Sequence, residues 1–180
     1  MTEPTLNSTE DGLNPCYGFS PIVPPKPKVL ILGTMPSVVS LKEAFYYAHP
    51  RNAFWPILAD TFQMPIETTE QKIRICNEKG ILLWDVLSAC ERKGSLDSAI
   101  KQPKANDFAA LFQTYPDLKA VLFNGKAAQN LFEKQVIQKQ SLPDDLMFYS
   151  LPSTSPANAQ LTFERKRVFW HKTLQKTPIK

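Results

Sequence analysis

Lys28–Gly33, with the sequence KVLILG, is the stretch that decides how this chain folds. It is short, rich in branched apolar residues and stops at a glycine, which is the pattern of a buried strand. Three further runs share this character: Ile81–Val86 (ILLWDV), Lys119–Gly125 (KAVLFNG) and Leu146–Leu151 (LMFYSL). Because these runs are continuously apolar rather than alternating, they predict strands of a parallel sheet that is covered on both faces.

Helix-like stretches separate and follow these strands. They are Phe54–Phe62, Thr68–Lys79, Asn106–Tyr115, Lys126–Val136 and Leu161–Lys176. Strands that alternate with helices predict an α/β fold, here a three-layer sandwich with a central parallel four-stranded sheet and helices on both faces. We expect residues 1–25, which are polar and then proline-rich, to form a flexible N-terminal leader, and residues 26–180 to form a single domain.

The composition excludes several classes of protein. The chain has 180 residues, of which 43% are apolar and 21% charged, as is typical of a globular protein. No apolar run approaches the roughly 18 residues that a membrane helix needs, and the polar N-terminus does not resemble a secretory signal. We therefore expect a soluble intracellular protein without membrane contact.

The cysteines and histidines argue against a metal site. Cys16, Cys76 and Cys90 share no close spacing, and His49 and His171 are the only histidines. Disulfide frameworks, zinc sites and iron–sulfur clusters need clustered ligands. We therefore expect chemistry that uses no metal and no cofactor.

The net charge of +4 is too small to indicate a partner by itself, but its distribution is uneven. Residues 162–180 carry six basic side chains, and Glu164 is their only acid. Such a segment could face the phosphates of a nucleic acid, or it could be a solvated helix face.

The ends of the predicted strands indicate where a ligand would bind. In parallel α/β sheets, ligands lie beyond the carboxyl ends of the strands. The segments found there are Thr34–Ser37, Asp85–Ser88, Asn124–Lys126 and Pro152–Ser155. We expect the functional site to be built from them.

Phe45–Trp55, FYYAHPRNAFW, concentrates five aromatic residues with a histidine, an arginine and an asparagine. Aromatic faces stack on nucleobases, and an arginine can meet phosphate. Alternatively, Phe54 and Trp55 belong to the core and only the tyrosines are exposed. Both interpretations hold if one aromatic side chain supports a pocket from the core side.

Gly33–Ser37 (GTMPS), together with Phe45–Trp55, resembles the first signature of the uracil-DNA glycosylase superfamily. Asn124–Lys126 resembles a segment of the mismatch-specific branch, and Leu151–Pro156 (LPSTSP) resembles the second signature, a serine-rich loop before the last helix. The pattern is closest to the hypoxanthine-DNA glycosylase and mismatch-specific (thymine/uracil) branches. The order and spacing of the segments agree with the family from about Gly18 to Lys176.

The resemblance implies a parallel four-stranded sheet with a DNA groove at the strand ends. It also implies a monofunctional DNA N-glycosylase that acts in base excision repair on DNA containing a damaged or mismatched base. Such an enzyme flips the target nucleotide into a pocket and hydrolyses the glycosidic bond with a positioned water.

The resemblance makes Asn52 a predicted catalytic residue, and Asp85 is a second candidate because it ends the second predicted strand. Asn52 matches the family's asparagine in the Pro-x-Asn-x-Phe-Trp run, where it would orient water through its carbonyl and donate to the base through its nitrogen. It could instead cap the helix that begins near Ala53. Asp85 could polarise water, or it could cap the turn into Val86–Cys90.

The same carry-over predicts a base pocket and contacts to the DNA backbone. Asn124 would read the polar edge of the base, with a turn role as the alternative, and either Tyr46 or Tyr47 would stack on the base. The remaining pocket residues are Gly33, Thr34, Met35 and Phe54. The predicted backbone contacts are Ser37, Lys126, Ser153, Thr154, Ser155 and Arg165. The serine-rich loop could instead be a capping loop, and an exposed helix face would also explain Arg165.

Two positions depart from the family pattern. Met35 stands where the mismatch-specific branch carries an asparagine, and Leu151 stands where the uracil-specific enzymes carry a histidine. These departures leave Asn52 as the expected catalytic side chain. They make hypoxanthine the first expected substrate and uracil the second.

Other functions stay open at this point. The alternatives are a non-catalytic DNA- or base-binding protein of the same fold and a nucleoside hydrolase. We expect a monomer that works in the cytoplasm, at the nucleoid of a bacterium, or in the nucleus of a eukaryote.

Overall fold

A computed structural model describes residues 12–179 of the chain. Its centre is a parallel sheet with the strand order β3-β2-β6-β7. The strands are β2 (Val29–Gly33), β3 (Ile81–Asp85), β6 (Ala120–Asn124) and β7 (Met147–Leu151). The predicted parallel four-stranded sheet is therefore confirmed, with each strand end within one residue of its predicted position.

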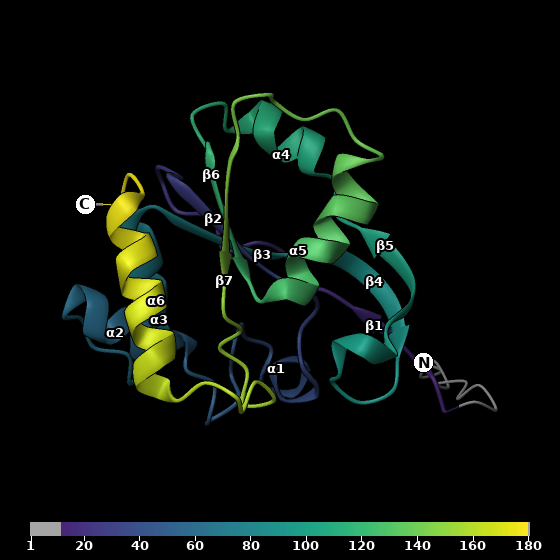
Figure 1. The fold of residues 1–180 in the computed structure, drawn as a ribbon, viewed down its shortest axis with the longest axis horizontal. Coiled ribbons are helices and arrows are strands. Elements are labelled where there is room, and N and C mark those ends of the chain that lie inside the picture. The colour runs from purple at the N-terminus through teal and green to yellow at the C-terminus, as the bar shows by residue number, and fades with distance from the viewer. Residues whose placement is uncertain (1–11, 180) are drawn as a thin grey trace, which may run out of the picture.

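Helices cover both faces of this sheet, as predicted (Figure 1). Val29 and Ile31 of β2 face the side occupied by α2 (Phe54–Phe62), α3 (Thr69–Lys79) and α6 (Phe163–Lys176). Leu30 and Leu32, which alternate with them, pack toward α4 (Phe108–Thr114), α5 (Lys126–Phe132) and the π-helix Glu133–Ile137 that continues α5. Because successive side chains of a strand point to opposite faces, one apolar strand contributes to both cores.

Side chains cap the starts of α3, α4 and α6, whereas α2 and α5 have no side-chain cap. Thr68 and Gln71 form a capping box, in which each side chain bonds the backbone N–H of the other. Asp107 and Thr162 likewise accept backbone N–H groups of α4 and α6. These caps explain why α4 and α6 each begin two residues later than the apolar pattern predicted. None of the helices within residues 12–179 is long and apolar enough to cross a membrane.

A second sheet was not predicted. It is antiparallel, with the order β1-β4-β5, and consists of β1 (Asn14–Tyr17), β4 (Leu87–Arg92) and β5 (Lys101–Ala105). Its strands are short, and β1 and β5 are largely exposed, so they lack the apolar pattern that identifies a buried strand. A short helix after β2, α1 (Val38–Glu43), was also not predicted, because it has six residues and Ser40 is its one buried side chain.

Residues 14–22 differ from the flexible leader that was predicted for residues 1–25, because they pair with both sheets. Strand β1 pairs along its whole length with β4, and Ile22 pairs with Leu83 of the central sheet. Two side chains also bond the backbone of this segment, Tyr46 at Ser20 and Trp84 at Phe19. The segment is ordered by partners far away in the sequence, which its own polar composition does not reveal. Residues 1–11 of the predicted leader lie outside the described part of the chain.

Candidate active site

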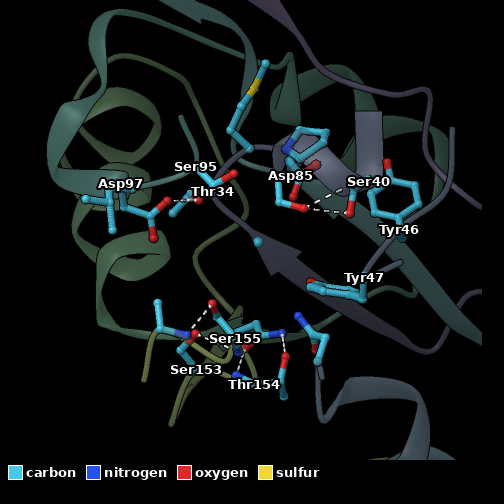
Figure 2. A pocket seen from close by; sticks show the side chains of 18 of the residues that line it. Thr34, Ser40, Tyr46, Tyr47, Asp85, Ser95, Asp97, Ser153, Thr154 and Ser155 are labelled. Atoms are coloured by element: carbon cyan, nitrogen blue, oxygen red, sulfur yellow. Dashed lines mark hydrogen bonds between the residues drawn. The ribbon is translucent and has the colours of Figure 1, made fainter. Parts of the chain in front are cut away.

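A pocket opens at the carboxyl ends of β2, β3 and β6, which is where the sequence placed the site (Figure 2). Most of the predicted site residues line it. They are Gly33, Thr34, Met35, Ser37, Tyr46, Tyr47, Asn52, Asp85, Asn124, Ser153, Thr154 and Ser155. The parallel register explains this convergence, because it pairs Gly33 with Asp85 and so brings the ends of two strands to one edge.

Gly33 lies where two polar groups converge. A Cβ atom on this glycine would lie 2.6 Å from Asp85 Oδ1 and 3.2 Å from Tyr47 Oη. No other residue type fits there without moving one of these groups. Tyr47 itself has a left-handed backbone, with φ 53°, and its ring centroid lies 4.0 Å from that of Phe54. This conformation is uncommon for an aromatic residue.

Tyr47 Oη and Asp85 Oδ2 are buried without a hydrogen-bond partner among residues 12–179. The alternative role of Asp85 as a turn cap is therefore wrong, because its carboxylate bonds no backbone N–H of the described chain. Burial is the main cause that raises the pKa of Asp85 to about 7; the nearby Asp97 raises it further and Arg92 opposes the shift. Burial also raises the pKa of Tyr47. Buried polar groups are costly when left unsatisfied, so these two atoms indicate a site for a polar ligand.

The two tyrosines have different positions. Tyr46 is only 4% exposed, and its hydroxyl donates to the Ser20 carbonyl at 2.9 Å. Tyr47 is partly exposed, and its ring has Phe54 behind it. Of the two, Tyr47 is the one whose ring is free to stack on a ligand in the pocket.

Asn52 lines the pocket and bonds the start of a helix. Its Oδ1 accepts the backbone N–H of Phe54, the first residue of α2, at 3.0 Å, whereas the N-cap position that the capping alternative gave to Asn52 belongs to Ala53. Within the described residues its Nδ2 makes no hydrogen bond. The side chain is thus oriented by the helix start, with a donor left over for a ligand.

Asn124 holds the serine-rich loop. Its Nδ2 donates to Thr154 Oγ1 and its Oδ1 accepts the Thr154 backbone N–H, both at 2.9 Å. Both side chains are buried. Gly125 allows the close approach of this loop, since a Cβ there would lie 2.9 Å from Ser153 Cβ. That Asn124 reads the edge of a base stays a prediction.

The serine-rich loop is also held from its other end. Ser155 N donates to Ser153 Oγ and Ala157 N donates to Ser155 Oγ, each at 3.2 Å. Lys166, which is buried, reaches from α6 to the Ser155 carbonyl at 3.1 Å. The loop therefore presents its hydroxyls on a fixed backbone at the pocket.

Three predicted residues do not line the pocket. Phe54 is completely buried behind Tyr47 and supports the pocket from the core side. Lys126 is exposed and donates to Gln129 of its own helix at 3.2 Å, while Arg165 is exposed on α6. The two cations lie on outward faces of helices, so their predicted contact with DNA stays untested.

The two positions that depart from the family pattern also differ from each other. Met35 lines the pocket, although it is only 6% exposed and packs in the core beneath. Leu151 is buried in the core on the other face of the sheet. Only Met35 therefore changes the chemistry of the lining directly.

Sequence reasoning missed several lining residues. They are Phe19, Ser40, Ser95, Leu96, Asp97 and Ala157. Asp97 is the one with chemical potential, because Thr34 Oγ1 donates to its Oδ1 at 2.5 Å. No local signal could have identified it, since it reaches the pocket only through the pairing of β4 with β5.

Arg92 stands behind this part of the pocket. It is 1% exposed and donates through Nη2 to the Pro36 carbonyl, while its Nε and Nη1 are buried without a partner among the described residues. Its positive charge lowers the pKa of both Asp85 and Asp97, although burial outweighs it at both carboxyls. Within residues 12–179, no group of three or more histidine, cysteine, aspartate or glutamate side chains could hold a metal ion.

Comparison with known proteins agrees with this geometry. Residues 20–174 match the family described as the uracil DNA glycosylase superfamily. A Methanosarcina barkeri protein named hypoxanthine DNA glycosylase is 37% identical over 111 residues, which are 61% of this chain and 70% of the relative. A protein of the same name from Methanosarcina acetivorans is 34% identical over 113 residues, or 62% of this chain and 72% of the relative.

A solved structure is similar in fold. It is the solution NMR structure of a Methanosarcina acetivorans protein that is provisionally assigned as a uracil DNA glycosylase. The two structures superpose with a TM-score of 0.75 at 29% identity, over 90% of this chain and 98% of the other. With its matching fold, strand-end pocket and family signatures, this chain belongs to the uracil DNA glycosylase superfamily.

Proposed function

We propose that this protein is a monofunctional DNA glycosylase that removes deaminated bases from DNA, with hypoxanthine as its first substrate and uracil as its second. The observation that carries the proposal is the pair of buried, unpartnered atoms, Tyr47 Oη and Asp85 Oδ2, at the floor of the pocket. The two relatives named hypoxanthine DNA glycosylase support the choice of substrate.

The floor of the pocket is complementary to the polar edge that a base acquires on deamination. Hypoxanthine presents a ring N–H next to a carbonyl, whereas adenine presents a bare ring nitrogen next to an amino group. In its ionised form, which predominates once the pH exceeds its raised pKa of about 7, Asp85 accepts from the ring N–H, and the Tyr47 hydroxyl donates to the carbonyl. Adenine would place an acceptor against the carboxylate, which leaves buried groups unpaired. Uracil carries the same N–H and carbonyl edge, which supports it as the second substrate.

The pocket walls account for the remaining steps. The nucleotide is flipped out of the duplex, and its base stacks on the Tyr47 ring, which Phe54 supports. The free Nδ2 of Asn52 donates to the base and stabilises the negative charge that develops as the glycosidic bond breaks. Ser153 and Ser155 bind phosphates of the flipped strand from their fixed loop.

The cellular setting belongs to the same proposal. We propose that the protein acts as a monomer on DNA in base excision repair. It works in the cytoplasm at the nucleoid of a bacterium, or in the nucleus of a eukaryote.

The test is base release from labelled duplexes that each carry one hypoxanthine, uracil, xanthine or mismatched thymine. Alkali cleaves the abasic product, and Asn52→Ala is compared with Asn130→Ala, an exposed asparagine on α5 that does not line the pocket. We expect release from hypoxanthine with the native protein and with Asn130→Ala. We expect a loss of at least about 100-fold with Asn52→Ala.

Other outcomes identify the alternatives. Tight binding of the duplexes without base release would indicate a non-catalytic DNA-binding protein, in which Met35 replaces a needed polar side chain. Hydrolysis of free inosine in preference to DNA would indicate a nucleoside hydrolase.

A further inference from the structure

The connection between β4 and β5 supplies a wall of the pocket that the family signatures do not contain. It carries Ser95, Leu96 and Asp97, which all line the pocket. Figure 2 shows Thr34 and Asp97 together on one side of the pocket and Tyr47 on the opposite side. A base stacked on Tyr47 would therefore have this wall across from it.

Two bonds attach this wall to the segment that follows β2, and Arg92, at the end of β4, adds a third. Thr34 Oγ1 donates to Asp97 Oδ1 at 2.5 Å, Val38 N donates to Ser95 Oγ at 2.9 Å, and Arg92 donates to the Pro36 carbonyl. The Asp97 carboxylate is thus held in place on one of its oxygens. Its Oδ2 makes no hydrogen bond within the described part of the chain.

The negative charge of Asp97 needs an explanation at a site for DNA. A carboxylate close to phosphates weakens binding, because DNA is itself a dense line of negative charge. No ion pair within 4.0 Å neutralises Asp97 among residues 12–179. A carboxylate that weakens DNA binding can still serve catalysis, either by stabilising the positive charge that develops on the sugar or by accepting a proton.

Hydrolysis needs an acceptor for a proton of the attacking water, and the pocket leaves few choices. Asn52 Oδ1 already accepts the Phe54 N–H. Asp85 lies at the floor and is 4% exposed, at the depth of the base. Asp97 belongs to an exposed stretch of the lining, although the protein around its carboxyl partly buries that group. The sugar of a flipped nucleotide lies nearer the mouth than its base, because the sugar stays attached to the DNA backbone.

We propose that Asp97 is a further catalytic residue, whose Oδ2 accepts a proton from the water that attacks C1′ of the flipped nucleotide. Thr34 is its positioning residue. The inference rests on the proposed glycosylase function and deepens it by naming the group that activates water. It also gives a reason why Met35 can stand at a position where other branches carry a polar side chain.

The step balances without any other reactant. The water oxygen forms a bond to C1′ as the bond from C1′ to the base nitrogen breaks, and the electron pair of that bond leaves with the base. One water proton passes to Asp97 and from there to solvent, while the base anion takes up a proton. The products are the free base and an abasic deoxyribose with a hydroxyl on C1′.

The experiment compares Asp97→Asn with the native protein under single-turnover conditions and measures DNA affinity separately on a duplex with a non-cleavable nucleotide analogue. Asparagine has the same shape and can still accept from Thr34, but it cannot take a proton. We expect the rate of base release to fall about 100-fold or more, while DNA affinity stays equal or rises because a negative charge is lost. Asp117→Asn, at an exposed position before β6, is the control and should change neither quantity.

A second pair of variants tests the positioning role. Thr34→Val removes the hydroxyl with little change in shape and should lower the rate about tenfold, whereas Thr34→Ser should retain most of the native rate. A rate of Asp97→Asn within threefold of native would overturn the inference and leave the proposed function standing. A parallel loss of rate and DNA affinity would also overturn it, because a structural role predicts that pattern. If the native protein released no base from any lesion, the proposed function and this inference would both fail.

Discussion

Asn124 and Thr154 hold each other through two hydrogen bonds of 2.9 Å, across thirty residues of sequence. One joins the two side chains, and the other joins the Asn124 oxygen to the Thr154 backbone. This pair connects the end of β6 to the serine-rich loop. The residue expected to read the base is therefore also the residue that sets the position of the loop expected to bind the phosphates.

Thr154→Val tests this connection. The valine keeps the shape but removes the hydroxyl, so Asn124 Nδ2 loses a buried partner. We expect the free energy of unfolding to fall by about 1–3 kcal/mol. DNA affinity should fall as well, because the loop loses one of its two attachments to Asn124. Urea unfolding and duplex binding measure the two effects. An unchanged DNA affinity in a less stable protein would show that the pair stabilises the fold without positioning the loop.

Gly33→Ala tests the floor of the pocket. Its methyl group would lie 2.6 Å from Asp85 Oδ1, so the carboxylate or the methyl must move. We expect base release to fall at least about 100-fold, because a displacement of about 1 Å is enough for such a loss. Gly12→Ala is the control for a change away from the pocket: its methyl would meet only Lys93, at 3.8 Å or more, and the strain at its φ of 65° should lower stability without changing base release. Native-like activity in Gly33→Ala would mean that Asp85 does not need its observed position.

Tyr47→Phe separates the hydroxyl from the ring. The hydroxyl is buried without a partner among the described residues, so its removal should leave the stability unchanged or raise it by about 1 kcal/mol. Hypoxanthine release should nevertheless fall about tenfold, because the donor to the base carbonyl is lost. Tyr47→Ala also removes the ring and should cost about 3 kcal/mol of stability. Thermal unfolding with single-turnover kinetics distinguishes the two variants, and a stability loss in Tyr47→Phe would indicate an unrecognised partner.

The titration of Asp85 should appear in the pH dependence of stability. Its pKa is raised from 3.8 to about 7, chiefly by burial, so the folded protein holds this proton more tightly than the unfolded chain. The resulting stabilisation is complete below the ordinary pKa and is lost as the pH rises toward the folded value. We expect the free energy of unfolding to decrease between about pH 4 and pH 7.

Asp85→Asn isolates this contribution. The variant cannot titrate at residue 85, so its unfolding free energy should decrease less than that of the native protein over the same range. The pKa of Asp97 is also raised by the protein that surrounds it, and that effect stays in both proteins. Urea unfolding across the range gives the comparison. Parallel curves for the two proteins would show that the carboxyl of Asp85 is not shifted.

Much of the central architecture could be predicted because its causes are local. The runs that became β2, β3, β6 and β7 are continuously apolar, and a strand buried on both faces requires that composition. The helix start at Thr68 is likewise visible in the sequence, because its capping partner Gln71 is three residues away. Since parallel strands end at a common edge, these elements also predicted where the pocket lies.

The features that could not be predicted also share a cause, which is that they depend on tertiary packing and not on the local sequence. Strand β1 has little apolar character and is ordered by backbone bonds to β4, more than seventy residues later in the chain. The distinction between Tyr46 and Tyr47 depends on the left-handed backbone of Tyr47, which adjacent aromatic letters do not encode. The exposed faces of α5 and α6, which turn Lys126 and Arg165 outward, also follow from helix packing.

The sequence by itself determined the parallel sheet, its flanking helices and most residues of the pocket. Strand burial, helix caps and family signatures all depend on residues that are close together in the sequence. Only the tertiary structure decided that Tyr47 Oη and Asp85 Oδ2 are left unpaired at the floor of the pocket, and that the Asp97 carboxylate also lines the pocket. Asp97 meets Thr34 because β4 and β5 pair and return the chain to the end of β2. Such a contact depends on how segments that are distant in the sequence pack together, so the local sequence around Thr34 or around Asp97 does not predict it.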